Sequence, residues 1–193
     1  MFRIKIAEDL FEYKKLYFLR EKFENLEDFS VIYAENYGRF KDKYDKFACH
    51  LIAKDKTDSI VGTIRVLFDT ELPYGLPIKE ITGRNIFFQS IEVSHFASSI
   101  KNYESLYLAF LQFIFSNCIE KRIENIYLII PIDFHKKLQK NGFVFEKTKI
   151  LNGRKSVVLI NTKKCFLTLK IRNYELYLSI KNFRLEESKL NIA

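Results

Sequence analysis

The ten residues FHKKLQKNGF, positions 134–143, place a short basic segment directly before a glycine and an aromatic residue. We expect a helix over Asp133–Asn141, because Gly142 can adopt the left-handed backbone conformation that ends many helices. The apolar run Ile126–Ile130 precedes this helix and is typical of a buried strand. A further strand is expected over Phe143–Ile150. The segment therefore predicts a strand–helix–strand unit.

Helix and strand signals alternate over the rest of the chain. Helices are expected over Glu8–Asn25 and Tyr103–Lys121, and the second is apolar almost all round, as in a helix buried on more than one side. The further strands expected are Phe2–Ile6, Ala48–Ala53, Ile60–Phe68, Ile86–Phe96 and Lys155–Asn161. This alternation predicts an α/β (α+β) protein with an open mixed β-sheet of about seven strands, flanked by helices on both faces.

Length and composition limit the class of protein. A chain of 193 residues has one domain by default. Its longest apolar runs, Tyr107–Phe115 and Ile126–Ile132, fall short of the roughly 18–20 residues of a membrane span. The amino terminus lacks the apolar stretch of a signal peptide. Cys49, Cys118 and Cys165 form neither a CxxC pair nor a disulfide framework. We expect a cytoplasmic protein without a membrane span.

The basic residues are concentrated in the last third of the chain. Residues 1–132 contain 18 Lys/Arg and 19 Asp/Glu, whereas residues 133–193 contain 14 and 5, a balance of +9. The structure of the chain beyond Lys163 is ambiguous in the sequence, so we separate a core, 1–163, from a basic C-terminal extension, 164–193. In this extension Phe166–Ile171 could form a strand, and Tyr174–Leu185 could form a helix or a strand. A basic block favours an acidic partner, namely nucleic acid, a membrane surface or an acidic protein. A well-solvated surface is the alternative.

Three further segments carry recognisable patterns. Arg39–Leu51 contains D-x-Y-D followed by A-x-H-L, and Ile91–Phe96 reads E-x-S-H-F. In Ile60–Leu67 an arginine follows a Gly-Thr pair, and Leu19-Arg20 places another arginine on the first helix. Together with the helix that ends in Gly-Phe, these segments resemble the GCN5-related N-acyltransferase (GNAT) core. Within that fold they resemble the long-chain N-acyl amino acid synthases and the acyl-homoserine-lactone (autoinducer) synthases, in order and spacing over residues 15–145.

The resemblance implies attack of an amine on an acyl thioester. Such a reaction needs a base for the amine and donors for the developing oxyanion. Glu92 is the candidate base, acting through water, and Ser94 is the second catalytic candidate. Glu92 lies in an otherwise apolar strand, where a carboxylate is costly and requires a reason. An edge position, or an ion pair with Arg65, is the structural alternative.

A charged cluster is implied for the acceptor. Asp42 and Asp45 are expected to shape its site together with the two arginines, although helix capping on a solvated surface is the alternative. Backbone amides of Val93–Phe96 are expected to hold the pantetheine arm. His95 stands where the family has arginine, which predicts the loss of one contact. The residues assigned to substrate binding are Arg20, Asp42, Asp45, Arg65, Val93, His95 and Phe96.

The loop Phe96–Tyr103 separates two kinds of acyl donor. Acetyltransferases that use coenzyme A bind its pyrophosphate on a glycine-bearing turn at a helix N-terminus, and no glycine lies between Gly83 and Gly142. This favours an acyl carrier protein, which is acidic and suits the basic block. The residues assigned to carrier-protein binding are Lys147, Lys149, Arg154, Lys155, Lys163 and Lys164.

The expected function is that of an N-acyltransferase. It would move an acyl group from an acyl-phosphopantetheine thioester, on an acyl carrier protein or on coenzyme A, to the amine of an amino acid or related small molecule. The helix 104–121 would line the acyl pocket. No tightly bound cofactor is expected, and His50 and His95 do not form a metal pattern. The alternatives are an acetyl-CoA-dependent acetyltransferase and a degenerate binding module; nucleic acid is not expected, because the block lacks a known motif.

Overall fold

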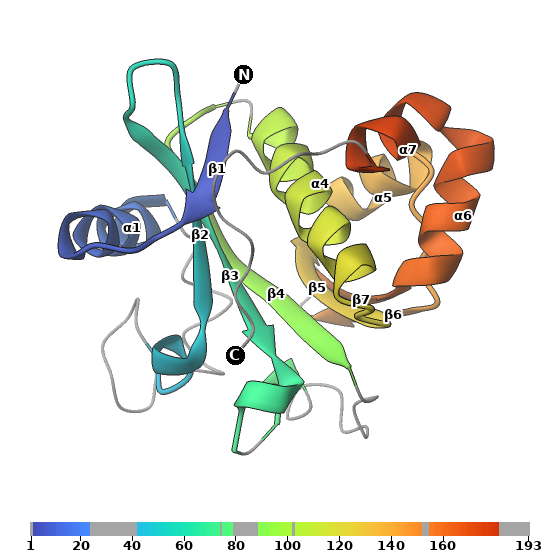
Figure 1. The fold of residues 1–193 in the computed structure, drawn as a ribbon, viewed down its shortest axis with the longest axis horizontal. Helices are drawn as coiled ribbons and strands as arrows, with labels where there is room; N and C mark the ends of the chain where they lie inside the picture. The colour runs from blue at the N-terminus through green and yellow to red at the C-terminus, as the bar shows by residue number, and fades with distance from the viewer. Residues whose placement is uncertain are drawn as a thin grey trace. The chain divides into compact units, whose positions relative to one another are not determined.

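A computed structural model describes residues 2–23, 42–73, 75–78, 89–101, 103–151 and 155–181. The described residues form a mixed seven-stranded sheet in the order β1-β2-β3-β4-β5-β7-β6 (Figure 1). The strands are β1 Arg3–Ile6, β2 Cys49–Lys54, β3 Ile60–Phe68, β4 Ser90–Ser98, β5 Asn125–Pro131, β6 Lys147–Leu151 and β7 Lys155–Asn161. The helices are α1 Leu10–Phe23, α4 Glu104–Glu120, α5 Ile132–Lys140, α6 Thr162–Arg172 and α7 Tyr174–Lys181, with short 3₁₀ turns η2 Asp45–Phe47 and η3 Asp69–Glu71. The predicted mixed α/β fold is confirmed.

The described residues fall into two compact units. The first contains the described parts of 1–67 together with 95–101 and 103–111, and the second those of 68–94 and 112–181. In the first unit, β2 is the centre of an antiparallel three-stranded arrangement with β1 and β3. Leu16 of α1 is buried there against Ala7 and Ile52. An apolar face of α1 thus forms part of the core of the first unit.

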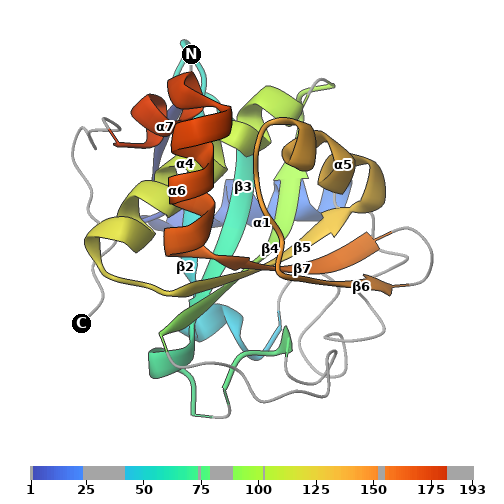
Figure 2. The ribbon, with the colours of Figure 1, turned by 90° about the vertical axis from the view of Figure 1, so that its right-hand side faces the viewer.

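In the second unit, strands β5, β7 and β6 form an antiparallel arrangement. The first half of β4 pairs in parallel with β5, from Ser90 opposite Asn125 to Val93 opposite Leu128. Helix α5 packs on β5 and β7, and α6 packs on β7 and α7 (Figure 2). Parallel pairing of β4 and β5 requires the crossover connection that α4 supplies.

The expected end of helix α5 is confirmed, but the expected strand after it is shorter. Gly142 has a φ of +94°, the left-handed conformation predicted for it. The Phe143 N–H donates to Leu138 O, so this residue still belongs to the helix end. Its ring packs edge-to-face on Phe115 at 5.4 Å. The apolar residues after the glycine therefore fill the core, and the strand begins only at Lys147.

The described part of the tail is helical, so the possible strand at 166–171 is wrong. The Asn161 side chain caps α6 by accepting the Lys164 N–H at 3.0 Å. Cys165 and Leu169, four residues apart, are both fully buried, which is helical spacing. Residues 24–25, 39–41, 86–88, 154 and 182–185, to which the sequence analysis assigned structure, motif or roles, lie outside the described residues.

Candidate active site

The candidate base Glu92 lies in β4, the fourth of the seven strands, so an edge position does not explain it. Its side chain is fully buried. One carboxylate oxygen accepts the Ile78 N–H at 2.8 Å, and the other accepts the Ser94 hydroxyl at 3.0 Å. A buried carboxylate is tolerated when its lone pairs are used in this way. The structure thus joins the two residues predicted to be catalytic.

Backbone strain lies directly beyond this pair. The registered pairing of β4 with β5 ends at Val93 opposite Leu128 among the described residues. Two residues later, His95 has a φ of +52°, in the left-handed region that non-glycine residues rarely occupy. Such a conformation costs on the order of 1–3 kcal/mol and persists where its surroundings enforce it, often at functional sites. The segment predicted to hold the thioester is therefore the strained part of β4.

The ring of Phe96 packs against helix α4. It meets Tyr107 edge-to-face at 4.8 Å and Phe110 at 6.3 Å, both on α4. Aromatic pairs in this geometry stabilise a core beyond the area that they bury. A role for Phe96 in substrate binding therefore rests on its backbone rather than on its side chain.

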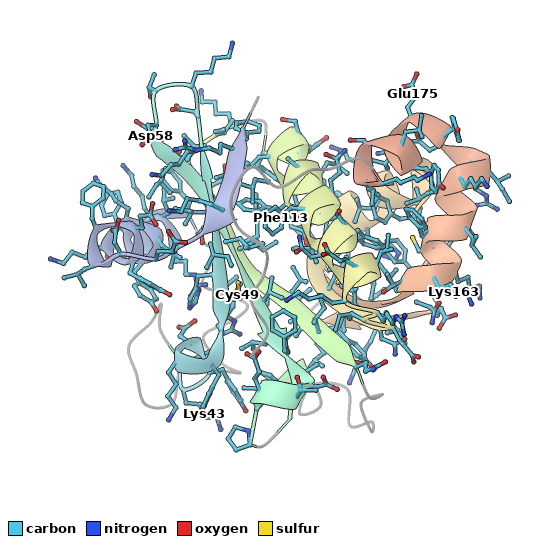
Figure 3. All side chains as sticks on the ribbon, viewed as in Figure 1. Lys43, Cys49, Asp58, Phe113, Lys163 and Glu175 are labelled. Carbon is cyan, nitrogen blue, oxygen red and sulfur yellow. The ribbon has the colours of Figure 1, made fainter. Side chains whose placement is uncertain are left out.

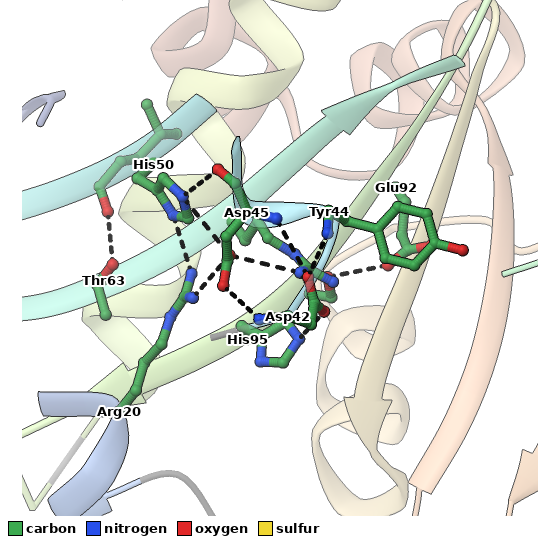
Figure 4. A network of polar contacts seen from close by, with 11 residues as sticks. Arg20, Asp42, Tyr44, Asp45, His50, Thr63, Glu92 and His95 are labelled. Carbon is green, nitrogen blue, oxygen red and sulfur yellow. Dashed lines mark hydrogen bonds and ion pairs between the residues drawn. The ribbon is translucent and has the colours of Figure 1, made fainter. Parts of the chain in front are cut away.

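A buried charged cluster occupies the first unit, as the resemblance implied (Figure 4). It consists of Arg20, Asp42, Asp45, His50 and Arg65, from α1, the 42–45 turn, β2 and β3. Arg20 Nη1 lies 3.0 Å from Asp45 Oδ1, and Arg65 Nη1 lies 2.6 Å from Asp42 Oδ2. Both guanidinium groups are fully buried. The solvated-surface alternative for the two aspartates is therefore wrong.

The two aspartates also build the turn that carries them. Asp42 Oδ1 accepts the N–H groups of Tyr44 and Asp45, at 2.8 and 3.1 Å. In return, Asp45 Oδ2 accepts the Asp42 N–H at 2.9 Å. Aspartate is favoured in turns because its short side chain reaches nearby backbone amides. The D-x-Y-D pattern thus encodes a tight turn as well as two charges.

His50 belongs to the cluster, although the sequence analysis did not assign it there. Arg20 Nη2 donates to its Nδ1 at 3.0 Å, since a guanidinium can only donate. The ring proton is thereby assigned to Nε2, which donates to Asp45 O at 3.2 Å. Burial, and then the charge of Arg20, lower the pKa of His50 to about 3. The ring is therefore neutral near pH 7. Its register opposite Arg65 in the β2–β3 pair is the signal that could have located it.

The carboxylates of the cluster are held ionised. Burial acts to raise the pKa of Asp45, but the charges of Arg20 and Arg65 outweigh it, and the pKa is lowered. Burial likewise opposes ionisation of Asp42, and His95 and Arg65 lower its pKa well below the ordinary range. His95 Nε2 lies 3.6 Å from Asp42 Oδ2. The histidine therefore lies beside the carboxylate cluster, and the expected loss of a contact relative to arginine stays a prediction.

The basic residues assigned to the carrier protein lie in the second unit. Lys149 of β6 and Lys163 and Lys164 of α6 are exposed, and Lys163 stands at the start of α6 in Figure 3. Lys164 also pairs with Glu146 at 3.3 Å. Helix α6 contains four basic residues and no acidic residue. The backbones of Lys147 and Lys155 lie on β6 and β7, but their side chains, like all of Arg154, are outside the described part.

The described residues contain neither a candidate membrane span nor a candidate metal site. Among them, no helix is both long and apolar enough to cross a membrane. Within the same ranges, no group of three or more His, Cys, Asp or Glu side chains could hold a metal ion.

Comparison with solved structures defines the fold. No protein-family model matches the sequence, and no curated protein matches it. FeeM, an N-acyl amino acid synthase from uncultured soil microbes, has a TM-score of 0.65 at 13% identity, over 90% of this chain and 98% of its own. The acyl-homoserine-lactone synthase LasI has a TM-score of 0.64 at 15% identity, over 84% and 90%.

The CoA-dependent acyl-homoserine lactone synthase BjaI, solved with SAM and isopentyl-CoA, has a TM-score of 0.66 at 16% identity, over 100% of this chain and 95% of its own. The chain therefore has the GNAT-like fold of the autoinducer synthases, as its sequence motifs implied. At this level of identity the likeness defines the fold, and the activity must be argued from the residues of the site.

Proposed function

We propose that the protein is an N-acyltransferase that moves an acyl group from a thioester to the amine of an amino acid or related small molecule. One observation carries the proposal. The fully buried Glu92 is held by Ser94 and the Ile78 amide, directly before the left-handed His95 of the same strand. A buried, oriented carboxylate next to strained backbone has the features of a catalytic base beside a backbone donor site.

In the proposed reaction, Glu92 accepts a proton from the attacking amine through one water molecule. The amine nitrogen forms a bond to the thioester carbonyl carbon, and the tetrahedral intermediate is stabilised by backbone N–H groups of Val93–Phe96. The C–S bond then breaks and the sulfur leaves, ending as a thiol with the released proton. Ser94 orients Glu92 through its 3.0 Å hydrogen bond.

We assign the charged cluster to the organisation of the acceptor site. Its arginines are completely buried, and each is paired with an aspartate of the 42–45 turn. A buried charge pair can fix one local geometry, because separating its partners leaves a charge without compensation. Arg20 and Arg65 are therefore proposed as positioning residues, which hold Asp42 and Asp45 in place.

We favour an acyl carrier protein as the donor. The sequence between Phe96 and Tyr103 has no glycine for a pyrophosphate-binding turn. An acidic partner is favoured by the exposed lysines of α6, among them Lys163 and Lys164. BjaI is described as CoA-dependent, so the experiment has to compare both donors.

The test is a matrix of acyl carrier proteins and acyl-CoA thioesters against a panel of amino acids, with products identified by mass spectrometry. We expect an acylated amine with a carrier-protein donor, and product formation by Glu92→Gln that is slower by about a hundredfold or more under the same conditions. Product formed only with acyl-CoA would overturn the donor assignment. A folded wild-type protein that acylates no amine with any donor would overturn the proposed function and favour a binding module.

A further inference from the structure

A cavity of about 480 Å³ lies in the second unit, away from the residues assigned to catalysis. It is formed where the end of α4, the segment before β5 and the start of α6 meet. Small-molecule sites commonly have volumes of about 300–1,000 Å³. Lys163, which is assigned above to the carrier protein, lines this cavity, whereas Glu92 and Ser94 do not.

The wall of the cavity is apolar. It is lined by Cys118, Ile119, Ile123 and Phe166. Cys118 is buried, and burial raises the pKa of its thiol well above the ordinary range. A neutral buried thiol behaves as a small hydrophobic group and not as a nucleophile. The wall therefore suits non-covalent binding of an apolar chain.

The rim of the cavity carries a net positive charge. Arg122 and Lys163 supply two cations, and Glu124 supplies one carboxylate. Arg122 follows α4 with a φ of +59°, and its N–H donates to Ile119 O at 3.3 Å. The two cations and one carboxylate sum to a single positive charge, which suits a monoanion better than a dianion.

One of the residues that line the cavity carries a buried hydroxyl. This residue, Thr162, is 3% exposed, and its Oγ1 has no hydrogen-bond partner in the part of the chain that the structure describes. Buried polar groups usually have a partner, so an orphan hydroxyl points to a missing one. Thr162 begins α6, a helix of 11 residues. Two amides of its first turn already have acceptors, because the Thr162 N–H donates to Glu124 O at 2.8 Å and the Lys164 N–H donates to Asn161 Oδ1 at 3.0 Å. Polar recognition in the cavity therefore falls to the hydroxyl and the two cations.

We propose that this cavity binds an amphiphilic monoanion, a carboxylate with a medium-length apolar chain. The headgroup would meet Thr162 Oγ1, Arg122 and Lys163, and the chain would lie against Ile119, Ile123 and Phe166. The proposal uses neither Glu92 nor Ser94, and it shares only Lys163 with the surface proposed for the carrier protein.

The test is titration of the protein with octanoate, 1-octanol and octyl phosphate, followed by calorimetry and by methyl NMR of isoleucine-labelled protein. Octanoate is expected to shift the methyl signals of Ile119 and Ile123, whereas binding near Glu92 would shift those of Ile91. Loss of one charged hydrogen bond typically weakens binding by about tenfold or more. We expect the affinity for octanoate to fall by this factor in Arg122→Asn and in Lys163→Gln. The wild type should bind 1-octanol more weakly than octanoate by the same factor. Asparagine tolerates the left-handed backbone at residue 122.

Lys170→Gln is the matched control, because Lys170 is an exposed lysine of α6 that does not line the cavity. Its affinity for octanoate should equal that of the wild type. Shifts confined to Ile91 would place octanoate elsewhere and overturn the proposal. Equal affinity for octanoate and 1-octanol, or for the wild type and Arg122→Asn, would do the same. Tighter binding of octyl phosphate would overturn the assignment of a monoanion.

Discussion

Glu92 is the residue on which the proposed chemistry depends most directly. Its carboxylate accepts the Ile78 N–H and the Ser94 hydroxyl, and glutamine has nearly the same shape. We expect Glu92→Gln to lower kcat by about 10²–10⁴-fold, the usual contribution of a general base, with little change in KM. Steady-state kinetics with the best donor and acceptor will measure this.

Ser94→Ala provides the comparison for that variant. If the hydroxyl only orients the carboxylate, kcat should fall by about tenfold, the cost of one hydrogen bond to a charged group. Both variants should show the thermal midpoint of the wild type within a few degrees. A Glu92→Gln protein with wild-type kcat would contradict the assignment of Glu92 as the base.

The lowered pKa of His50 makes the free energy of unfolding depend on pH. Its pKa is lowered to about 3 in the folded protein from 6.5. Below pH 6.5 the unfolded chain therefore binds a proton that the folded chain does not. The free energy of unfolding should fall by about 1.4 kcal/mol for each pH unit between roughly pH 6 and 5 on account of His50. The contribution is fully present above pH 6.5 and is lost as the pH falls toward 3.

The measurement is urea unfolding of the wild type and of His50→Asn at several pH values. Burial also lowers the pKa of His135, so this histidine adds to the wild-type slope. The difference between the two proteins isolates His50. Parallel curves for the two proteins would show that His50 titrates alike in both states. The lowered pKa values of Asp42 and Asp45 add a further loss only below about pH 5.

The charge of Asp45 compensates a buried arginine of the cluster. Asp45→Asn leaves the buried Arg20 guanidinium without the carboxylate at 3.0 Å. Removing one partner of a buried ion pair typically costs about 3–5 kcal/mol. Chemical denaturation should show a loss of this size. As a control, Asp58→Asn removes a surface carboxylate that pairs with Lys54, and should cost less than about 1 kcal/mol.

At the scale of elements, Gly142 at the end of α5 has a matched control in Gly75, which lies in the loop after η3. Gly142 and Gly75 have φ values of +94° and +74°, so alanine at either position costs about 1–2 kcal/mol in backbone strain. A Cβ on Gly142 would also lie 3.2 Å from Leu169 Cδ2, whereas a Cβ on Gly75 meets no atom within 4 Å. We expect Gly142→Ala to be the more destabilising change in thermal unfolding. Equal losses would show that Leu169 moves aside freely.

The elements with strong local signals were predictable from the sequence. Gly142 ended its helix as expected, and the strands expected at Ala48–Ala53 and Ile60–Phe68 formed within one residue of their predicted bounds. The strand predicted to begin at Phe143 begins only at Lys147, because the apolar residues 143–145, which fill the core, have the pattern of a strand in the sequence. The possible strand at 166–171 was wrong because two buried residues four apart, Cys165 and Leu169, outweigh a short apolar run.

The candidate site was predictable only where a motif named its residues. The pairs Arg20–Asp45 and Arg65–Asp42 join residues more than 20 positions apart, and only the family patterns brought them together. His50 stands in the A-x-H-L pattern, but the pattern gave it no role in the site, and it is the β2–β3 register that places it opposite Arg65. The left-handed φ of His95 was not predictable from the sequence, because the strand expected over Ile86–Phe96 implied extended backbone at this position.

At the scale of the whole molecule, the uneven charge makes a kinetic prediction. Residues 133–193 carry a balance of +9, and α6 contributes four basic residues to it. Lys163→Glu with Lys164→Glu should raise KM for an acyl carrier protein by about tenfold or more, while KM for an acyl-CoA stays unchanged. The wild-type KM for the carrier protein should also rise with added salt.

Lys14→Glu with Lys15→Glu changes the net charge equally, but on the exposed face of α1 in the first unit. This control should leave KM for the carrier protein close to that of the wild type. An equal rise in both double variants would mean that net charge alone, and not the surface of α6, attracts the carrier protein.

The left-handed backbone at residue 95 restricts which amino acids evolution or a library can place there. Among non-glycine residues, asparagine, aspartate and histidine enter this region most readily, and β-branched side chains least. A saturation library at this codon, selected for folding alone, should therefore retain glycine, asparagine and aspartate and discard valine, isoleucine and threonine. Among the selected variants, position 95 would then read as a turn residue in the middle of a strand.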